Sequence, residues 1–86
     1  MKKHEQADLE KVMRAILTEN KELARDERLK RAAKAGMLYC ENKGFTAGAT
    51  LALYDEKGHV THELSGREAL SYMLVGMADE MLNEEN

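Results

Sequence analysis

The sequence of 86 residues contains no proline, no tryptophan and only one cysteine, Cys40. A single cysteine excludes a disulfide within the chain and favours a reducing compartment, so we expect a cytoplasmic protein. The sequence also lacks any apolar run near the roughly 20 residues that a membrane-spanning helix requires. Its first residues, Met1 to His4, do not lead into an apolar run. We therefore expect neither a secretory signal nor a membrane segment.

Aromatic residues are scarce as well, with one Phe and three Tyr, so the core must be built from Leu, Val, Ala and six Met. A chain of this length forms one domain, residues 1–86, and buries roughly 60% of its unfolded surface. A thin core together with 34% charged residues is typical of small proteins that dimerise or bind a partner. The net charge of −3 argues weakly against a dedicated nucleic-acid binder, which is usually basic.

Catalytic and metal-binding patterns are also missing. Cys40 falls on an Ala-rich helical stripe, where a small buried thiol is the ordinary interpretation. His59 and His62 are three residues apart on a predicted strand, so they point to opposite faces and cannot bind one metal ion. The glycines match no phosphate-binding loop. We therefore expect no catalytic residue, no metal site and no cofactor, and we expect that the protein is not an enzyme.

The first half of the chain has no glycine before Gly36 and is predicted to be helical over about residues 5–43. A first apolar stripe with helical spacing contains Leu9, Val12, Met13, Ile16 and Leu23. A second stripe, at a different angle, contains Leu29, Ala32, Ala33, Gly36 and Cys40. This change of phase favours two helices that break near residues 23–26 with Asp26 as N-cap, and one continuous helix is the alternative. Gly44 is predicted to end the helical part in the left-handed C′ position.

A β-hairpin is predicted over about residues 49–64, with strands at 50–54 and 59–64 and a turn at 55–58. A four-residue turn would place Leu53 opposite Val60, Leu51 opposite His62 and Ala49 opposite Leu64. The predicted apolar face therefore contains Ala49, Leu51, Leu53, Val60 and Leu64. His62 would lie on this face, either with its ring reaching water or half-buried and sensitive to pH near neutrality.

A final helix is predicted over about residues 66–83, and Ser65 to Glu68 fit the capping-box pattern at its start. One arc of about 100° is positioned to cover the hairpin and contains Leu70, Met73, Leu74, Met77 and Met81. A second arc contains Tyr72, Val75 and Leu82, which we expect to be buried by the N-terminal helices, a second subunit or a target protein. The predicted fold is α+β, in the order helix, helix, strand, strand, helix.

The sequence supports two hypotheses for function. The first is a non-enzymatic protein-interaction module, such as an adaptor or an inhibitor of a larger protein, that forms a homodimer. Its predicted protein-binding residues are Tyr72, Val75, Leu82, Met73, Met77 and Met81. The alternative is a dimeric nucleic-acid-associated regulator that uses the basic residues Arg25, Arg28, Lys30, Arg31 and Lys34. The ordinary interpretation of that basic stretch is a solvated helix face with intrahelical ion pairs.

Overall fold

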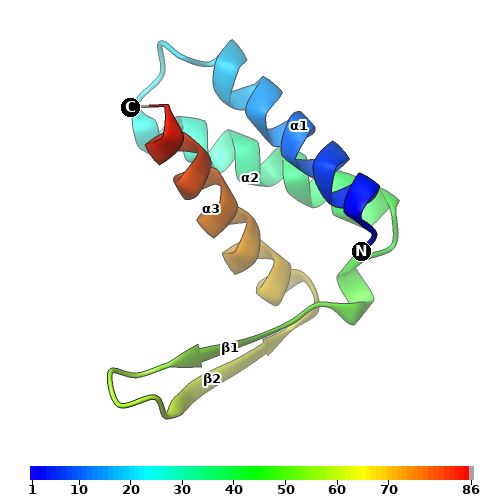
Figure 1. The fold of residues 1–86 in the computed structure, drawn as a ribbon, viewed down its shortest axis with the longest axis vertical. Coiled ribbons are helices and arrows are strands. Elements are labelled where there is room, and N and C mark those ends of the chain that lie inside the picture. The colour runs from blue at the N-terminus through cyan, green and yellow to red at the C-terminus, as the bar shows by residue number, and fades with distance from the viewer. Residues whose placement is uncertain (86) are drawn as a thin grey trace.

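The computed structural model describes residues 1–85 and confirms the α+β fold and the predicted order of elements (Figure 1). Asn86, the last residue of the predicted domain, lies outside the described residues. The elements are α1 (Lys3–Glu19), α2 (Arg25–Asn42), the 3₁₀ turn η1 (Thr46–Gly48), β1 (Thr50–Tyr54), β2 (Val60–Ser65) and α3 (Gly66–Glu84). Within the described residues, no helix is both long enough and apolar enough to span a membrane.

The N-terminal half forms two helices, as the change of phase between its apolar stripes predicts. α1 ends at Glu19, and its C-cap residue is Asn20, whose side-chain amide donates to the carbonyl oxygen of Ile16 at 2.7 Å. The prediction of Asp26 as N-cap of α2 is wrong, because Ala24 is the N-cap and its carbonyl oxygen already accepts the Arg28 N–H at 3.0 Å. Asp26 lies instead in the first turn, where a carboxylate favours the positive end of the helix dipole.

Gly44 ends the helical part as predicted, with a positive φ of 76°. Its N–H donates to the Glu41 carbonyl oxygen at 3.1 Å, and the Phe45 N–H donates to the Cys40 carbonyl oxygen at 3.0 Å. This pair of bonds is a Schellman motif, which satisfies carbonyl groups at the end of α2. The motif turns the chain from α2 into η1 and the hairpin.

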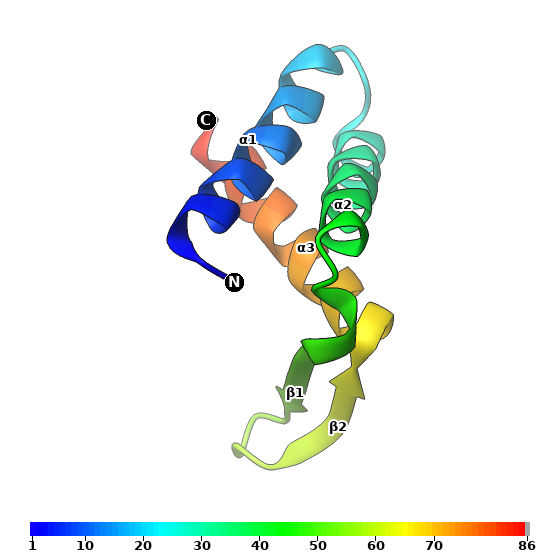
Figure 2. The same cartoon turned by 90° about the vertical axis from the view of Figure 1, so that its right-hand side faces the viewer.

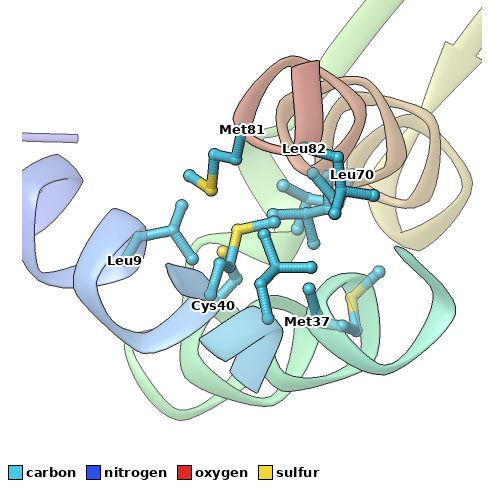
Figure 3. Close-up of a cluster of buried hydrophobic side chains, with 11 residues drawn as sticks. Leu9, Met37, Cys40, Leu70, Met81 and Leu82 are labelled. Atoms are coloured by element: carbon cyan, nitrogen blue, oxygen red, sulfur yellow. The ribbon is translucent and has the colours of Figure 1, made fainter. Parts of the chain in front are cut away.

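The core lies between the three helices, and Figure 2 shows α1, α2 and α3 gathered on one side of the hairpin. Figure 3 shows side chains from all three helices meeting in one cluster. Met13, Leu17, Leu74 and Cys40 are its largest fully buried members. The other buried members are Leu9, Ala32, Met37, Leu70, Ala78, Met81 and Leu82.

The hairpin forms where predicted, but its register is shifted. Leu51 lies opposite Leu64 instead of His62, and Leu53 lies opposite His62 instead of Val60. Two features cause the shift. Tyr54 pairs with Val60, so the turn is one residue longer than the assumed four-residue turn, and an irregularity at Leu53/Tyr54 shifts the remaining pairs by one further residue.

The shifted register also changes which residues share a face. Ala49 does not face Leu64; its carbonyl oxygen accepts the Gly66 N–H at 2.9 Å. Val60 pairs with Tyr54 and therefore leaves the face that contains Leu51, Leu53 and Leu64. His62 stays on that apolar face, but it is exposed, as the interpretation with a solvated ring required.

The predicted capping box at Ser65 is wrong, because the Ser65 side chain forms no capping hydrogen bond. Ser65 is instead the last residue of β2, and its Cα partner in β1 is Thr50. The next residue, Gly66, has a φ of 60°, which a residue with a side chain rarely adopts. The direct transition from β2 into α3 therefore depends on Gly66 rather than on a serine cap.

α3 packs on the hairpin and contacts both of its strands. Most of its buried face meets α1 and α2, because Leu70, Leu74 and Met81 belong to the helical core. The hairpin joins this core at its base and projects away from it (Figure 1). Leu51, Leu53 and Leu64 are consequently only partly buried.

Candidate protein-interaction surface

A shallow groove of about 380 Å³ runs along the outer side of α2 and α3, and we call it the α2–α3 groove. Residues of α2 that are three and four positions apart form one wall, and similarly spaced residues of α3 form the other. The lining residues are Lys30, Ala33, Lys34, Met37, Leu38, Glu41, Arg67, Ser71 and Val75.

Large apolar side chains are exposed at this groove. Leu38 is 54% exposed and Val75 is 40% exposed, although both lie in helices that bury their opposite faces. Tyr72 is 55% exposed and lies three residues before Val75, so the two side chains are neighbours on the α3 surface. Together they form an apolar patch on the outside of the helix pair.

Positive side chains surround this patch. Lys30, Lys34 and Arg67 line the same groove. Arg67 donates to the Glu41 carboxylate, whereas Lys30 and Lys34 form no ion pair with any described residue. The groove therefore combines exposed apolar groups with a positive charge that is only partly neutralised.

The predicted second arc of α3 divides into two parts. Tyr72 and Val75 are exposed, and Val75 lines the α2–α3 groove. Leu82 is buried among the N-terminal helices, which was one of the three expected ways to cover this arc. Leu82 is therefore part of the core and not of a free surface.

The three predicted methionines are also separated. Met81 is buried in the core, Met77 is partly buried and Met73 is exposed. Met73 and Met77 line a second hollow, of about 550 Å³, between α1, α3 and the start of β1. The other lining residues are Met1, Gln6, Leu9, Gly44, Phe45, Gly48, Ala49, Thr50, Leu70 and Leu74.

The predicted basic stretch does not form one continuous patch. Arg25 is ion-paired with Asp79 at 2.7 Å, and Arg28 is ion-paired with Glu85 at 3.0 Å. The acidic end of α3 therefore neutralises two of the five predicted positive charges.

The remaining cations of this stretch have different surroundings. Arg31 donates to the Asn20 side-chain oxygen at 3.3 Å. Lys30 and Lys34 line the α2–α3 groove, as described above. The structure thus places two of the predicted nucleic-acid-binding residues beside the predicted protein-binding residue Val75.

Cys40 is not arranged as a nucleophile. Its thiol is fully buried in the helical core, and this burial raises the pKa of Cys40 above its ordinary value. Reactive cysteines have a lowered pKa and access to solvent. Among residues 1–85, no group of three His, Cys, Asp or Glu side chains is placed to hold a metal ion.

Sequence reasoning did not assign a binding role to six of the nine residues that line the α2–α3 groove, among them Leu38 and Arg67. A signal for Leu38 was present, because at 100° per residue it lies on the opposite side of α2 from Leu29. An apolar residue so far from the buried stripe is a candidate for a contact outside the chain. No comparable signal marks Arg67, because its position depends on how α2 and α3 pack.

Comparisons of the chain with protein-family models, with curated proteins and with solved structures find no match.

Proposed function

We propose that this protein is a non-enzymatic protein-interaction module, an adaptor or an inhibitor, that binds its partner through the α2–α3 groove. The observation that carries this proposal is the exposure of Leu38 and Val75 in one groove beside Lys30 and Lys34. An exposed apolar patch bordered by polar groups is typical of a binding surface.

The groove also indicates the chemistry of the partner. The side chains of α2 and α3 form the two walls of the groove. A groove of this kind suits a third helix, as in helix-in-groove recognition. The apolar patch would contact apolar side chains of that helix, and Lys30, Lys34 and Arg67 would contact its carboxylates. The proposed partner segment is therefore an acidic amphipathic helix.

Two further parts of this proposal come from the sequence. We place the protein in the cytoplasm because its one cysteine is free and buried, which suits a reducing compartment. We also propose that the protein acts as a homodimer, since a two-stranded sheet is marginally stable and its apolar residues are only partly buried.

Affinity purification with a matched pair of variants tests the proposed surface. Val75→Glu puts a carboxylate among the apolar groups and beside the lysines, whereas Ala15→Glu puts one on an exposed position of α1 outside the groove. We expect wild type and Ala15→Glu to recover the same partner at near-stoichiometric amounts, and Val75→Glu to lose it while its circular dichroism stays native. Equal recovery of that partner by Val75→Glu would exclude the α2–α3 groove as the binding surface.

The nucleic-acid alternative has weaker support, because Asp79 and Glu85 neutralise Arg25 and Arg28. It predicts that affinity for DNA or RNA falls steeply with salt concentration, and that Lys30→Ala with Lys34→Ala flattens this slope by about two. Electrophoretic or fluorescence titrations at low salt measure both effects. Absence of binding to either nucleic acid at low salt would eliminate this alternative.

A further inference from the structure

The outer edge of β1 carries a row of backbone groups without partners in the two-stranded sheet. The Gly66 N–H donates to the Ala49 carbonyl oxygen at 2.9 Å, which identifies an inward-facing position at Ala49. Hydrogen-bonding residues alternate along an antiparallel strand, so Leu51 and Leu53 also point their backbone groups towards β2. The N–H and C=O groups of Thr50, Ala52 and Tyr54 therefore point outward.

This edge lacks the charged and proline residues that often prevent pairing with another chain. β1 contains no charged residue, no proline and no glycine over Thr50–Tyr54. The other edge, along β2, contains Glu63 and His62 within the strand. Charged side chains protect exposed edges, so β1 is the edge that is open to a further strand.

We propose that β1 pairs antiparallel with β1 of a second copy of this chain, around a two-fold axis at Ala52. The product is a single four-stranded sheet with the two β1 strands in its centre. This inference rests on the homodimer proposed above, and it specifies which surface forms that dimer.

The second copy is the occupant that fits this edge best, because the edge is complementary to itself. All five residues of β1 find a partner when Ala52 lies opposite its own copy and Thr50 opposite Tyr54. The outward-pointing groups then lie opposite one another, with the smallest side chain of the strand at the axis. Leu51 would lie opposite Leu53, which joins the two partly buried apolar faces.

The position of the edge also leaves the partner surface free. The α2–α3 groove contains no residue of β1. The 550 Å³ hollow does include Ala49 and Thr50, so the apolar space between α1 and α3 is continuous with the start of β1. A second copy seated on β1 would therefore meet apolar surface next to the paired backbones.

Sedimentation or light scattering on the full chain tests this arrangement. We expect wild type at micromolar concentration to have about twice the 9.7 kDa mass of one chain. Ala52→Pro removes an outward N–H and keeps the bonds to β2, so it should weaken the dimer by about a hundredfold. Glu63→Pro is the matched control, because Glu63 lies opposite Ala52 and its backbone N–H points outward on the β2 edge. It should remain dimeric.

A charge-reversal pair covers the case in which a proline variant fails to fold. Ala52→Lys and Ala52→Glu each place like charges opposite one another at the axis, so each should be monomeric alone. An equimolar mixture should recover the dimer as a heterodimer. Native mass spectrometry resolves the three species.

The outcomes separate this inference from the proposals on which it rests. A monomeric wild type would overturn both the homodimer and the pairing of β1, without bearing on partner binding through the α2–α3 groove. A dimeric wild type whose Ala52→Lys and Ala52→Glu variants both stay homodimeric would overturn only the pairing of β1. If Glu63→Pro dissociates the dimer and Ala52→Pro does not, the pairing of β1 is overturned and the β2 edge forms the interface.

Discussion

Gly36 lies where α2 packs closely against the rest of the core. A Cβ atom at this position would lie 3.0 Å from Leu74 Cδ2 and 3.1 Å from Met13 Sδ. Both of these side chains are fully buried, so neither can move away into solvent. The absence of a side chain at Gly36 therefore allows α2 to pack closely against Leu74 and Met13.

The variant Gly36→Ala should be less stable than wild type by up to about 2 kcal/mol. Overpacking destabilises by about 1–3 kcal/mol, and the gain in helix propensity of about 1 kcal/mol offsets part of this. Gly76→Ala is the matched control in α3, because a Cβ there would meet nothing within 4 Å. It should raise stability by about 0.5–1 kcal/mol. Urea denaturation measures both changes, and equal stabilisation by the two variants would contradict the close approach at Gly36.

Cys40 should make stability depend on alkaline pH. Burial raises the pKa of Cys40 in the folded protein above that of an unfolded cysteine, which is about 8.5. The stabilisation is therefore fully present below the unfolded pKa and is lost as pH rises through the folded pKa. We expect the free energy of unfolding of wild type to fall above pH 8.5 more steeply than that of Cys40→Ala. Parallel curves for the two proteins between pH 7 and pH 10 would contradict this prediction.

At the scale of elements, Arg28 fastens the start of α2 to the end of α1. Its guanidinium donates twice to the Leu17 carbonyl oxygen, at 2.7 and 3.3 Å, and also to Glu85 at 3.0 Å. Its side chain is only 12% exposed. Arg25, three residues earlier, forms its ion pair with Asp79 at a half-exposed position.

This difference predicts unequal effects of two similar substitutions. Arg28→Ala should destabilise the protein by about 1–3 kcal/mol, because it removes charge-assisted bonds and leaves a terminal carbonyl of α1 without its partner. Arg25→Ala should change stability by less than about 1 kcal/mol, since exposed ion pairs contribute little. Thermal unfolding of both variants at low salt and at 0.5 M salt, where the Debye length is about 4 Å, measures the two losses of stability. A larger loss for Arg25→Ala would show that the Arg28 contact is not a structural link.

The elements themselves were predictable because their signals are local. The phase change between two apolar stripes located the break before α2, and Gly44 located its end. The hairpin register was not predictable in this way. Asp55 Oδ1 accepts the N–H groups of Lys57 and His59, both at 2.9 Å, in a turn that pairs Tyr54 with Val60. A bulge beyond that pair then shifts the rest of the register by one further residue. Periodicity in the sequence does not record such a bulge.

The candidate site was predictable only in part. The helical angle of Val75 and Tyr72 separated them from the buried arc, and both are exposed. The same reasoning grouped Leu82 with them, although the inclination of α3 brings Leu82 into the core. A helical wheel gives the direction of a side chain but not the position of the neighbouring helix. The groove between α2 and α3 depends on that position.

The whole molecule consists of a helical core and a projecting hairpin (Figure 1). Its radius of gyration is 13.6 Å, compared with about 12 Å expected for a compact chain of this length. The difference agrees with a hairpin that extends beyond the core instead of folding onto it. A projecting two-stranded hairpin contributes little buried area to its own chain, so it is the part of the molecule best placed to serve an interface.

Amide hydrogen exchange should reveal this division directly. Amides of the core, such as that of Cys40, open only when the protein unfolds, so their exchange should be slow at every protein concentration. The amides of Thr50, Ala52 and Tyr54 point outward from β1, so they should exchange rapidly in the monomer.

These three amides should become protected as protein concentration rises through the dimer dissociation constant, because each would then donate to the second copy. Glu63 is the internal control, since its amide points outward on the β2 edge and should stay unprotected throughout. Exchange measured by NMR at two concentrations resolves individual amides. Protection of Glu63 without protection of Ala52 would place the second copy on the opposite edge, and unchanged exchange at both edges of a dimeric sample would place the interface on the helices.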